Sequence, residues 1–170
     1  MFITEIINRH KEIAYYKSLP VLFDGFYKAD GLGFGAVRLA CVEKRPGDMI
    51  LGYVPAYYFE MRVDGNRVGA VSLRVGYSKS LYFTGQIGYA VDAPHRGNGY
   101  AGDACRALIP LMLKHGMIKV LITNNTDNLA SRRVCEKLGA KFIRVAKIPC
   151  SHEQFEDGAR YKNIFEWNIV

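Results

Sequence analysis

The spacing of hydrophobic and polar residues along the first half of the chain predicts one helix and several strands. Apolar residues at helical spacing predict a short helix over 6–18. Residues 19–52 are irregular and rich in glycine, so we expect a short helix and a long loop there. Alternation over 57–75, interrupted by turn residues at 64–66, predicts an antiparallel hairpin. A further strand is predicted over 81–91.

The second half of the chain alternates predicted helices with predicted strands. Helical spacing over 100–115 is followed by Gly116 as a stop signal, and Pro110 inside this pattern predicts a kink. The remaining elements are a buried strand, a helix and two closing strands, over residues 119–123, 129–138, 141–148 and 162–170, with a loop at 149–160.

This order of elements defines a fold class. It contains neither internal repeats nor a break in composition. We therefore expect one domain over residues 1–170, of the α+β class, with a mixed and mostly antiparallel central sheet flanked by helices.

Charge and cysteine usage narrow the classes of function. The formal net charge of +7 favours an anionic ligand, but the basic residues are dispersed and no nucleic-acid-binding motif is present, so we expect no nucleic-acid partner. The four cysteines lack the spacing of a zinc site, so we expect no metal, reduced thiols and a cytoplasmic location. No apolar run is long enough to cross a bilayer, and we expect no membrane association.

The segment His-Arg-Gly-Asn-Gly-Tyr-Ala-Gly, residues 95–102, contains the G-x-G-x-x-G pattern of a dinucleotide-binding turn. Antiparallel strands precede it and no acidic residue ends the following strand, so the context disfavours a nicotinamide or flavin cofactor. A glycine-rich turn before a helix still predicts phosphate binding, because free N–H groups and the positive end of the helix dipole attract anions. The competing interpretation is a plain connection between a strand and a helix.

Two segments together resemble the GNAT superfamily of N-acetyltransferases. IGYAVDAPHRGNGYAGDACRALI, residues 87–109, resembles its acetyl-CoA-binding motif, whose signature Q/R-x-x-G-x-G/A is met by Arg96, Gly99 and Ala101. NLASRRVCEKLGAKF, residues 128–142, resembles its second conserved segment, in the form seen in the branch of ribosomal-protein and N-terminal acetyltransferases. The resemblance extends over about residues 50–170 and implies the acyl-CoA N-acyltransferase fold.

The resemblance implies a set of residues that bind acetyl-CoA. The backbone of Tyr89 and Val91 would pair with the pantetheine arm, backbone amides of the turn would hold the pyrophosphate, and Asn128 would contact the cofactor arm. The implied cofactor-binding residues are Tyr89, Val91, Arg96, Gly97, Asn98, Gly99, Tyr100, Ala101, Gly102, Asn128 and Ser131. Taken alone, Asn128 and Ser131 also fit a helix N-cap and its first turn.

The catalytic residues are less clearly marked. Many members of the superfamily carry a tyrosine as general acid where this chain has Cys135, so Cys135 and Ser131 are both candidate proton donors. Relatives often carry a glutamate or histidine where Gln86 stands, and glutamine is not a useful base. Glu60 and His95 are the alternative bases, and a relay through water is a third possibility.

We therefore predict an acetyl-CoA-dependent N-acetyltransferase that acts on a primary amine of a small molecule, peptide or protein. No activated nucleophile is evident, so we expect direct transfer in a ternary complex of a monomer or homodimer. The alternative is a regulatory domain that binds CoA without turnover, and a basic nucleic-acid-binding module is the third hypothesis.

Overall fold

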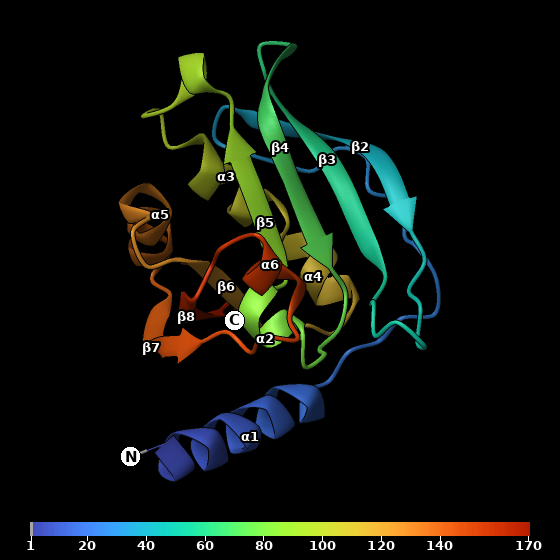
Figure 1. Ribbon diagram of the computed structural model, residues 1–170. Helices are drawn as coiled ribbons and strands as arrows, with labels where there is room; N and C mark the ends of the chain where they lie inside the picture. The colour runs from blue at the N-terminus through green and yellow to red at the C-terminus, as the bar shows by residue number, and fades with distance from the viewer. Residues whose placement is uncertain (1) are drawn as a thin grey trace.

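The computed structural model describes residues 2–170, which form two antiparallel sheets (Figure 1). In the larger sheet the strands follow the order β1-β2-β3-β4-β5, and in the smaller sheet the order is β6-β8-β7. The strands are β1 (Gly33–Phe34), β2 (Val37–Arg45), β3 (Ala56–Val63), β4 (Asn66–Arg74), β5 (Ile87–Val91), β6 (Lys119–Asn125), β7 (Lys141–Lys147) and β8 (Tyr161–Asn168). This arrangement confirms the predicted α+β class with mostly antiparallel pairing and flanking helices, and the strands form two sheets where one central sheet was predicted.

Helices cover one face of the larger sheet and flank the smaller one. In Figure 1, α3 and α4 lie behind the larger sheet, α5 lies beside β5, and α1 lies below the rest of the molecule. The helices are α1 (Phe2–Ser18), α2 (Leu81–Thr84), α3 (Tyr100–Ala107), α4 (Ile109–Lys114), α5 (Leu129–Leu138) and α6 (Glu153–Glu156), with a 3-10 turn η1 at Ala93–His95. No helix in the described chain is both long and apolar enough to cross a membrane.

Alternation along β3 separates the core from an open face of the larger sheet. Tyr57, Phe59 and Met61 are buried in the core together with residues of α3 and α4, whereas Tyr58 and Glu60 point to the other face. Successive side chains of a strand point to opposite faces, so the cross-strand partners of Tyr58 and Glu60 lie on the same open face. The open face lies toward the reader in Figure 1.

Gln86 joins the two sheets where they meet. Its backbone N–H donates to Leu121 O at 2.8 Å, and its side-chain Oε1 accepts from Leu121 N–H at 2.6 Å. Its Nε2 donates to Gly76 O at 3.0 Å, and the side chain is fully buried. The amide therefore satisfies a backbone donor and a backbone acceptor that would otherwise be unpaired in the interior.

Two predicted segments differ from the structure. The segment 19–52, expected to hold a short helix and a loop, contains β1 and the nine-residue β2 instead of a helix. The predicted strand over 81–91 is divided into α2 and β5, because Gly85 adopts φ 77° and turns the chain between them. Buried Leu81, Tyr82 and Phe83 belong to this helical turn instead of a strand, and Tyr82 and Phe83 pack against the smaller sheet.

The predicted kink at Pro110 is confirmed. The helical pattern is interrupted at Leu108, where α3 ends and α4 begins with Pro110 in its first turn. Proline needs no hydrogen-bond donor in that position, so the break places it where the helix tolerates it.

Candidate active site

The two sheets separate beyond Gln86 and leave a gap between β5 and β6. Asp92 N–H donates to Val68 O, so the backbone of Asp92 faces β4. Backbone groups alternate sides along a strand, so those of Tyr89 and Val91 face away from β4, toward β6. Across the gap, Thr123 turns its backbone toward β5 by the same alternation. Beyond the pairing of Gln86 with Leu121, no backbone hydrogen bond in the described chain joins β5 to β6. Two strand edges are thus available to a bound molecule.

The turn between β5 and α3 presents a row of free backbone donors. The N–H groups of residues 97–102 donate to no other group of the described chain. Gly97 has φ 84° and Gly99 has φ 81°, and a Cβ at either position would meet open space. These conformations suit glycine and let an anion approach the backbone closely. The turn thus fits the pyrophosphate of acetyl-CoA.

Polar side chains hold this turn in shape. Arg96 Nε donates to Val91 O at 3.0 Å, and Asn98 Nδ2 donates to His95 O at 3.0 Å. The Arg96 side chain is exposed, so its remaining donors face solvent beside the free N–H groups. Tyr100, Ala101 and Gly102 form the first turn of α3, whose dipole adds positive potential.

The phenol of Tyr89 meets α5 on the covered side of β5. Its hydroxyl lies 2.8 Å from Ser131 Oγ and 3.3 Å from Ser131 O. Burial raises the pKa of Tyr89 far above its usual value, so the phenol stays protonated. Ser131 N–H donates to Asn128 Oδ1 at 3.0 Å, which makes Asn128 the N-cap of α5.

Cys135 lies in a buried row of polar side chains one turn further along α5. Asn163 Nδ2 donates to Asn124 Oδ1 at 2.8 Å, and Asn124 Nδ2 lies 3.7 Å from Cys135 Sγ. Burial raises the pKa of the Cys135 thiol to about 11, despite hydrogen bonds that favour the thiolate. The thiol is therefore protonated at neutral pH and is a poor nucleophile.

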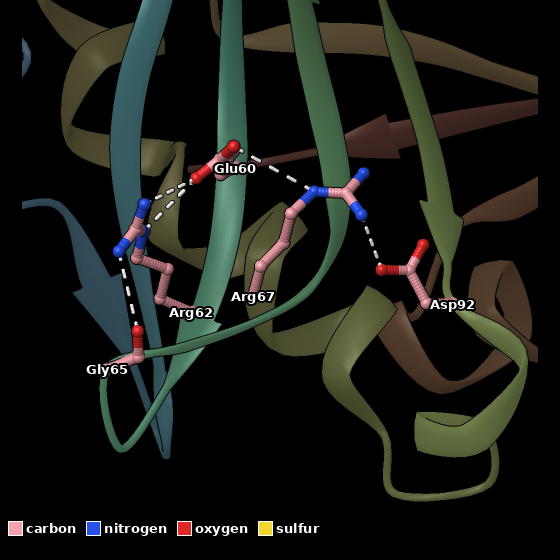
Figure 2. A network of polar contacts seen from close by, with 5 residues as sticks. All are labelled: Glu60, Arg62, Gly65, Arg67 and Asp92. Atoms are coloured by element: carbon pink, nitrogen blue, oxygen red, sulfur yellow. Dashed lines mark hydrogen bonds and ion pairs between the residues drawn. The ribbon is translucent and has the colours of Figure 1, made fainter.

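Glu60 lies in a network of ion pairs on the open face, shown in Figure 2. Its Oε2 lies 2.7 Å from Arg62 Nη2, and its Oε1 lies 3.9 Å from Arg67 Nε. Arg67 also pairs with Asp92 at 2.6 Å, which links β3 and β4 to the end of β5. Both carboxylate oxygens of Glu60 thus have cationic neighbours. Glu60 does not join the Tyr89 phenol and α5, because the side chains of Glu60 and Tyr89 lie on opposite faces of the larger sheet.

The sequence did not predict three features of the candidate site. Gln86 stands where relatives often carry a base, and in this structure its side chain joins the two sheets. Tyr89 was expected to act through its backbone, but its phenol also contacts Ser131. Arg74 and a cavity beside it were not recognised. Each depends on residues distant in the sequence, and only the alternation along β4 could have placed Arg74 on the open face.

Comparisons with known proteins show the family of the chain. The sequence profile of the acetyltransferase (GNAT) domain matches residues 23–141, which is more than half of the chain, and the chain belongs to this family. No curated protein sequence matches the chain.

Solved structures show the same fold. The microcin C7 self-immunity acetyltransferase MccE, solved with acetyl-CoA and AMP, aligns with a TM-score of 0.50 at 21% identity over 66% of this chain and 61% of that chain. RimJ of Mycobacterium smegmatis, solved with CoA-disulfide, aligns with a TM-score of 0.52 at 19% identity over 66% and 53%. An acetyltransferase of Salmonella typhimurium, described as modifying the N-terminal serine of ribosomal protein L7/L12, gives 0.53 at 18% over 71% and 67%. The chain thus spans less than two thirds of the length of the first two.

Proposed function

We propose that this protein transfers an acetyl group from acetyl-CoA to a primary amine. The observation that carries the proposal is the row of free N–H groups over residues 97–102, placed at the end of a strand whose backbone faces an open gap. Pyrophosphate suits the row of donors, and an extended pantetheine arm suits the strand edge of Tyr89 and Val91. Family membership supports the same assignment.

In this proposal each bound group has defined neighbours. Arg96 and the amides of Gly97, Asn98, Gly99, Tyr100, Ala101 and Gly102 surround the pyrophosphate. Tyr89 and Val91 pair through backbone groups with the arm, although Val91 O is already bonded to Arg96. The exposed amide NH₂ of Asn128 has no partner in the described chain and is available to the arm. A Tyr89 N–H directed into the gap would also stabilise the oxyanion that forms on the acetyl carbon.

Proton transfer at the thiol depends on the pair of Ser131 and Tyr89. When the amine attacks the thioester carbon, the C–S bond breaks and the sulfur needs a proton. Ser131 Oγ can donate this proton and is then reprotonated by solvent, which takes up the proton that the amine loses. The Tyr89 phenol, 2.8 Å from Ser131 Oγ, stays protonated and holds the hydroxyl in position. Cys135, with its pKa of about 11, serves as a second protonated neighbour of this pair.

The amine loses its proton to solvent on the open side. Glu60 was predicted as a base, and its ion pairs with Arg62 and Arg67 favour a relay through water over direct transfer to the carboxylate. Cys135 is buried and protonated, which argues against a covalent acetyl-enzyme. We therefore propose direct transfer in a ternary complex, in the cytoplasm, where all four cysteines stay reduced.

Thiol release from acetyl-CoA, measured against a broad panel of amines, tests this proposal. We expect binding of acetyl-CoA, amine-dependent release of CoA and no mass increase of the intact protein from an acetyl group that replaces a hydrogen. Absence of acetyl-CoA binding would refute the proposal. Binding without release for any amine would favour the regulatory alternative, and an acetylated Cys135 would refute direct transfer.

A further inference from the structure

A cavity of about 440 Å³ opens on the open face of the larger sheet, near the end of β4. Its lining includes Arg45, Tyr53, Tyr58, Arg74, Thr84 and Glu153. These residues come from β2, the loop before β3, β3, β4, α2 and α6. The volume falls within the range of cavities that hold small-molecule ligands.

Arg74 connects this cavity to the proposed site of transfer. Its backbone N–H donates to Gln86 O at 2.8 Å, and its Nη1 would lie 3.5 Å from a Cβ built on Gly88. The guanidinium group therefore lies over Gly88, the residue before Tyr89 on β5. Because Tyr89 turns its backbone into the gap and its phenol toward α5, Arg74 approaches β5 from the opposite face.

The two arginines that line the cavity differ in whether a carboxylate neutralises them. Arg45 Nε lies 2.6 Å from Glu43 Oε1, and its guanidinium stacks on the ring of Tyr58 at 4.7 Å. The Arg74 side chain has no carboxylate partner in the described chain, and the one hydrogen bond of its guanidinium there is a long one of 3.4 Å from Nη1 to Gly85 O. Glu153 is the acidic residue of the lining, and it is exposed on α6. Arg74 thus offers a half-buried positive charge with most of its donors unused.

Such a guanidinium is suited to an anion. It carries five N–H donors in a planar fork that matches a carboxylate or phosphate, and it remains charged at any physiological pH. Gly88 leaves space beside the Arg74 guanidinium, since a Cβ at this position would lie 3.5 Å from Arg74 Nη1 and 3.1 Å from Ser72 Oγ.

We propose that the acetyl acceptor is a small amine that also carries a carboxylate or phosphate, and that Arg74 binds this anionic group in the cavity. The proposal rests on the proposed acetyltransferase function. The anion on Arg74 would hold the acceptor over Gly88 and direct its amine toward the gap. Arg74 is then the residue that determines acceptor specificity.

Matched pairs of amines test this inference. Each pair differs only in the anionic group: leucine and its methyl ester, glutamate and its dimethyl ester, phosphoethanolamine and ethanolamine. We expect kcat/KM, measured by thiol release, to favour the anionic member of at least one type of pair by about ten-fold or more. The carboxylate and phosphate pairs identify which anion the cavity takes.

Variants of Arg74 separate specificity from folding. Arg74→Gln should remove the preference by raising KM for the anionic member while leaving the Kd of acetyl-CoA unchanged. Arg74→Lys keeps the positive charge and should retain part of the preference. It is the variant to use if Arg74→Gln does not fold. Arg38→Gln, an exposed arginine on β2 at the far side of the same sheet, should behave like the wild type.

The outcomes distinguish the two proposals. If acetyl-CoA does not bind, the proposed function fails. If acetyl-CoA binds but both members of every pair react equally, or neither member of any pair reacts, the inference about Arg74 is wrong. An equal loss for both members in Arg74→Gln would also contradict it.

Discussion

Proton delivery to the leaving thiolate depends, at the scale of single residues, on Ser131. We expect Ser131→Ala to lower kcat by about 100-fold, because a positioned proton donor contributes about that much to an acyl transfer. Tyr89→Phe, which removes the phenol 2.8 Å from Ser131 Oγ, should lower kcat by a smaller factor of about ten. The Kd of acetyl-CoA, measured by titration calorimetry, should change little in either variant.

A serine outside the site provides the control for these variants. Ser18→Ala alters an exposed serine at the end of α1, whose hydroxyl donates to Tyr15 O, and should leave kcat unchanged. A kcat of Ser131→Ala equal to that of the wild type would exclude the proposed role of the hydroxyl.

Local sequence was sufficient to predict the turn at 96–102, because its glycines and the following helix are contiguous. The contacts of Gln86, Tyr89 and Arg74 were not predictable in the same way. Gln86 bonds to Leu121 and Tyr89 to Ser131, so each partner lies 35 or more residues away in the sequence. Such contacts are defined only after the two sheets are placed against each other.

A chain of hydrogen bonds fixes the loop after α1 to the end of α4. Tyr27 N–H donates to Tyr57 Oη at 2.8 Å, and Tyr57 Oη lies 2.9 Å from His115 Nε2. His115 Nδ1 lies 2.9 Å from Leu22 O, a carbonyl that can only accept. Nδ1 therefore carries the proton, and Nε2 accepts from the Tyr57 hydroxyl. The arrangement requires a neutral histidine, and burial lowers the pKa of His115 below 6.5.

At the scale of elements we expect this histidine to make stability depend on pH. Below pH 6.5 the unfolded chain takes up a proton at His115 that the folded chain does not bind. The free energy of unfolding therefore falls as the pH decreases below 6.5, by at most about 1.4 kcal/mol per pH unit from this group, and the loss ends below the folded pKa. Urea unfolding at several pH values measures this slope.

Two histidine variants identify the source of the slope. His115→Gln keeps a donor and an acceptor without a titrating group, so its stability should fall less between pH 7 and pH 5 than that of the wild type. His10→Gln changes an exposed histidine of α1 and should keep the slope of the wild type. A slope unaffected by His115→Gln would contradict the assignment.

The strength of the sequence pattern decided which elements could be predicted. The hairpin of β3 and β4 alternates around a turn with Gly65 at φ 80°, and both features are local. β2 follows a glycine-rich segment and is exposed over most of its second half, so its alternation is weak. The segment 81–91 is mostly apolar, with Thr84 and Gln86 as its polar residues, and Gly85 marks the change from α2 to β5.

At the scale of the whole molecule, the two sheets divide the proposed reaction between two sides of β5. The free amides of 97–102 and the pair of Ser131 and Tyr89 lie toward α3 and α5. Arg74 and its cavity lie on the open face. The net charge of +7 favours anionic ligands, the class to which both proposed substrates belong. Gln86 joins the two sheets at the start of β5, where the gap proposed for the acetyl-CoA arm begins.

Titration calorimetry of acetyl-CoA with Gly99→Asp is the most direct test of the central claim, that the turn at 96–102 holds the pyrophosphate. A carboxylate at position 99 would enter the cradle and repel the phosphates, so we expect affinity to fall by about 100-fold or more. Gly65→Asp is the matched control, since Gly65 has φ 80°, close to the 81° of Gly99, and equally open surroundings. The account predicts that Gly65→Asp binds acetyl-CoA like the wild type and that Gly99→Asp, although folded, does not. Unchanged affinity in folded Gly99→Asp would contradict it.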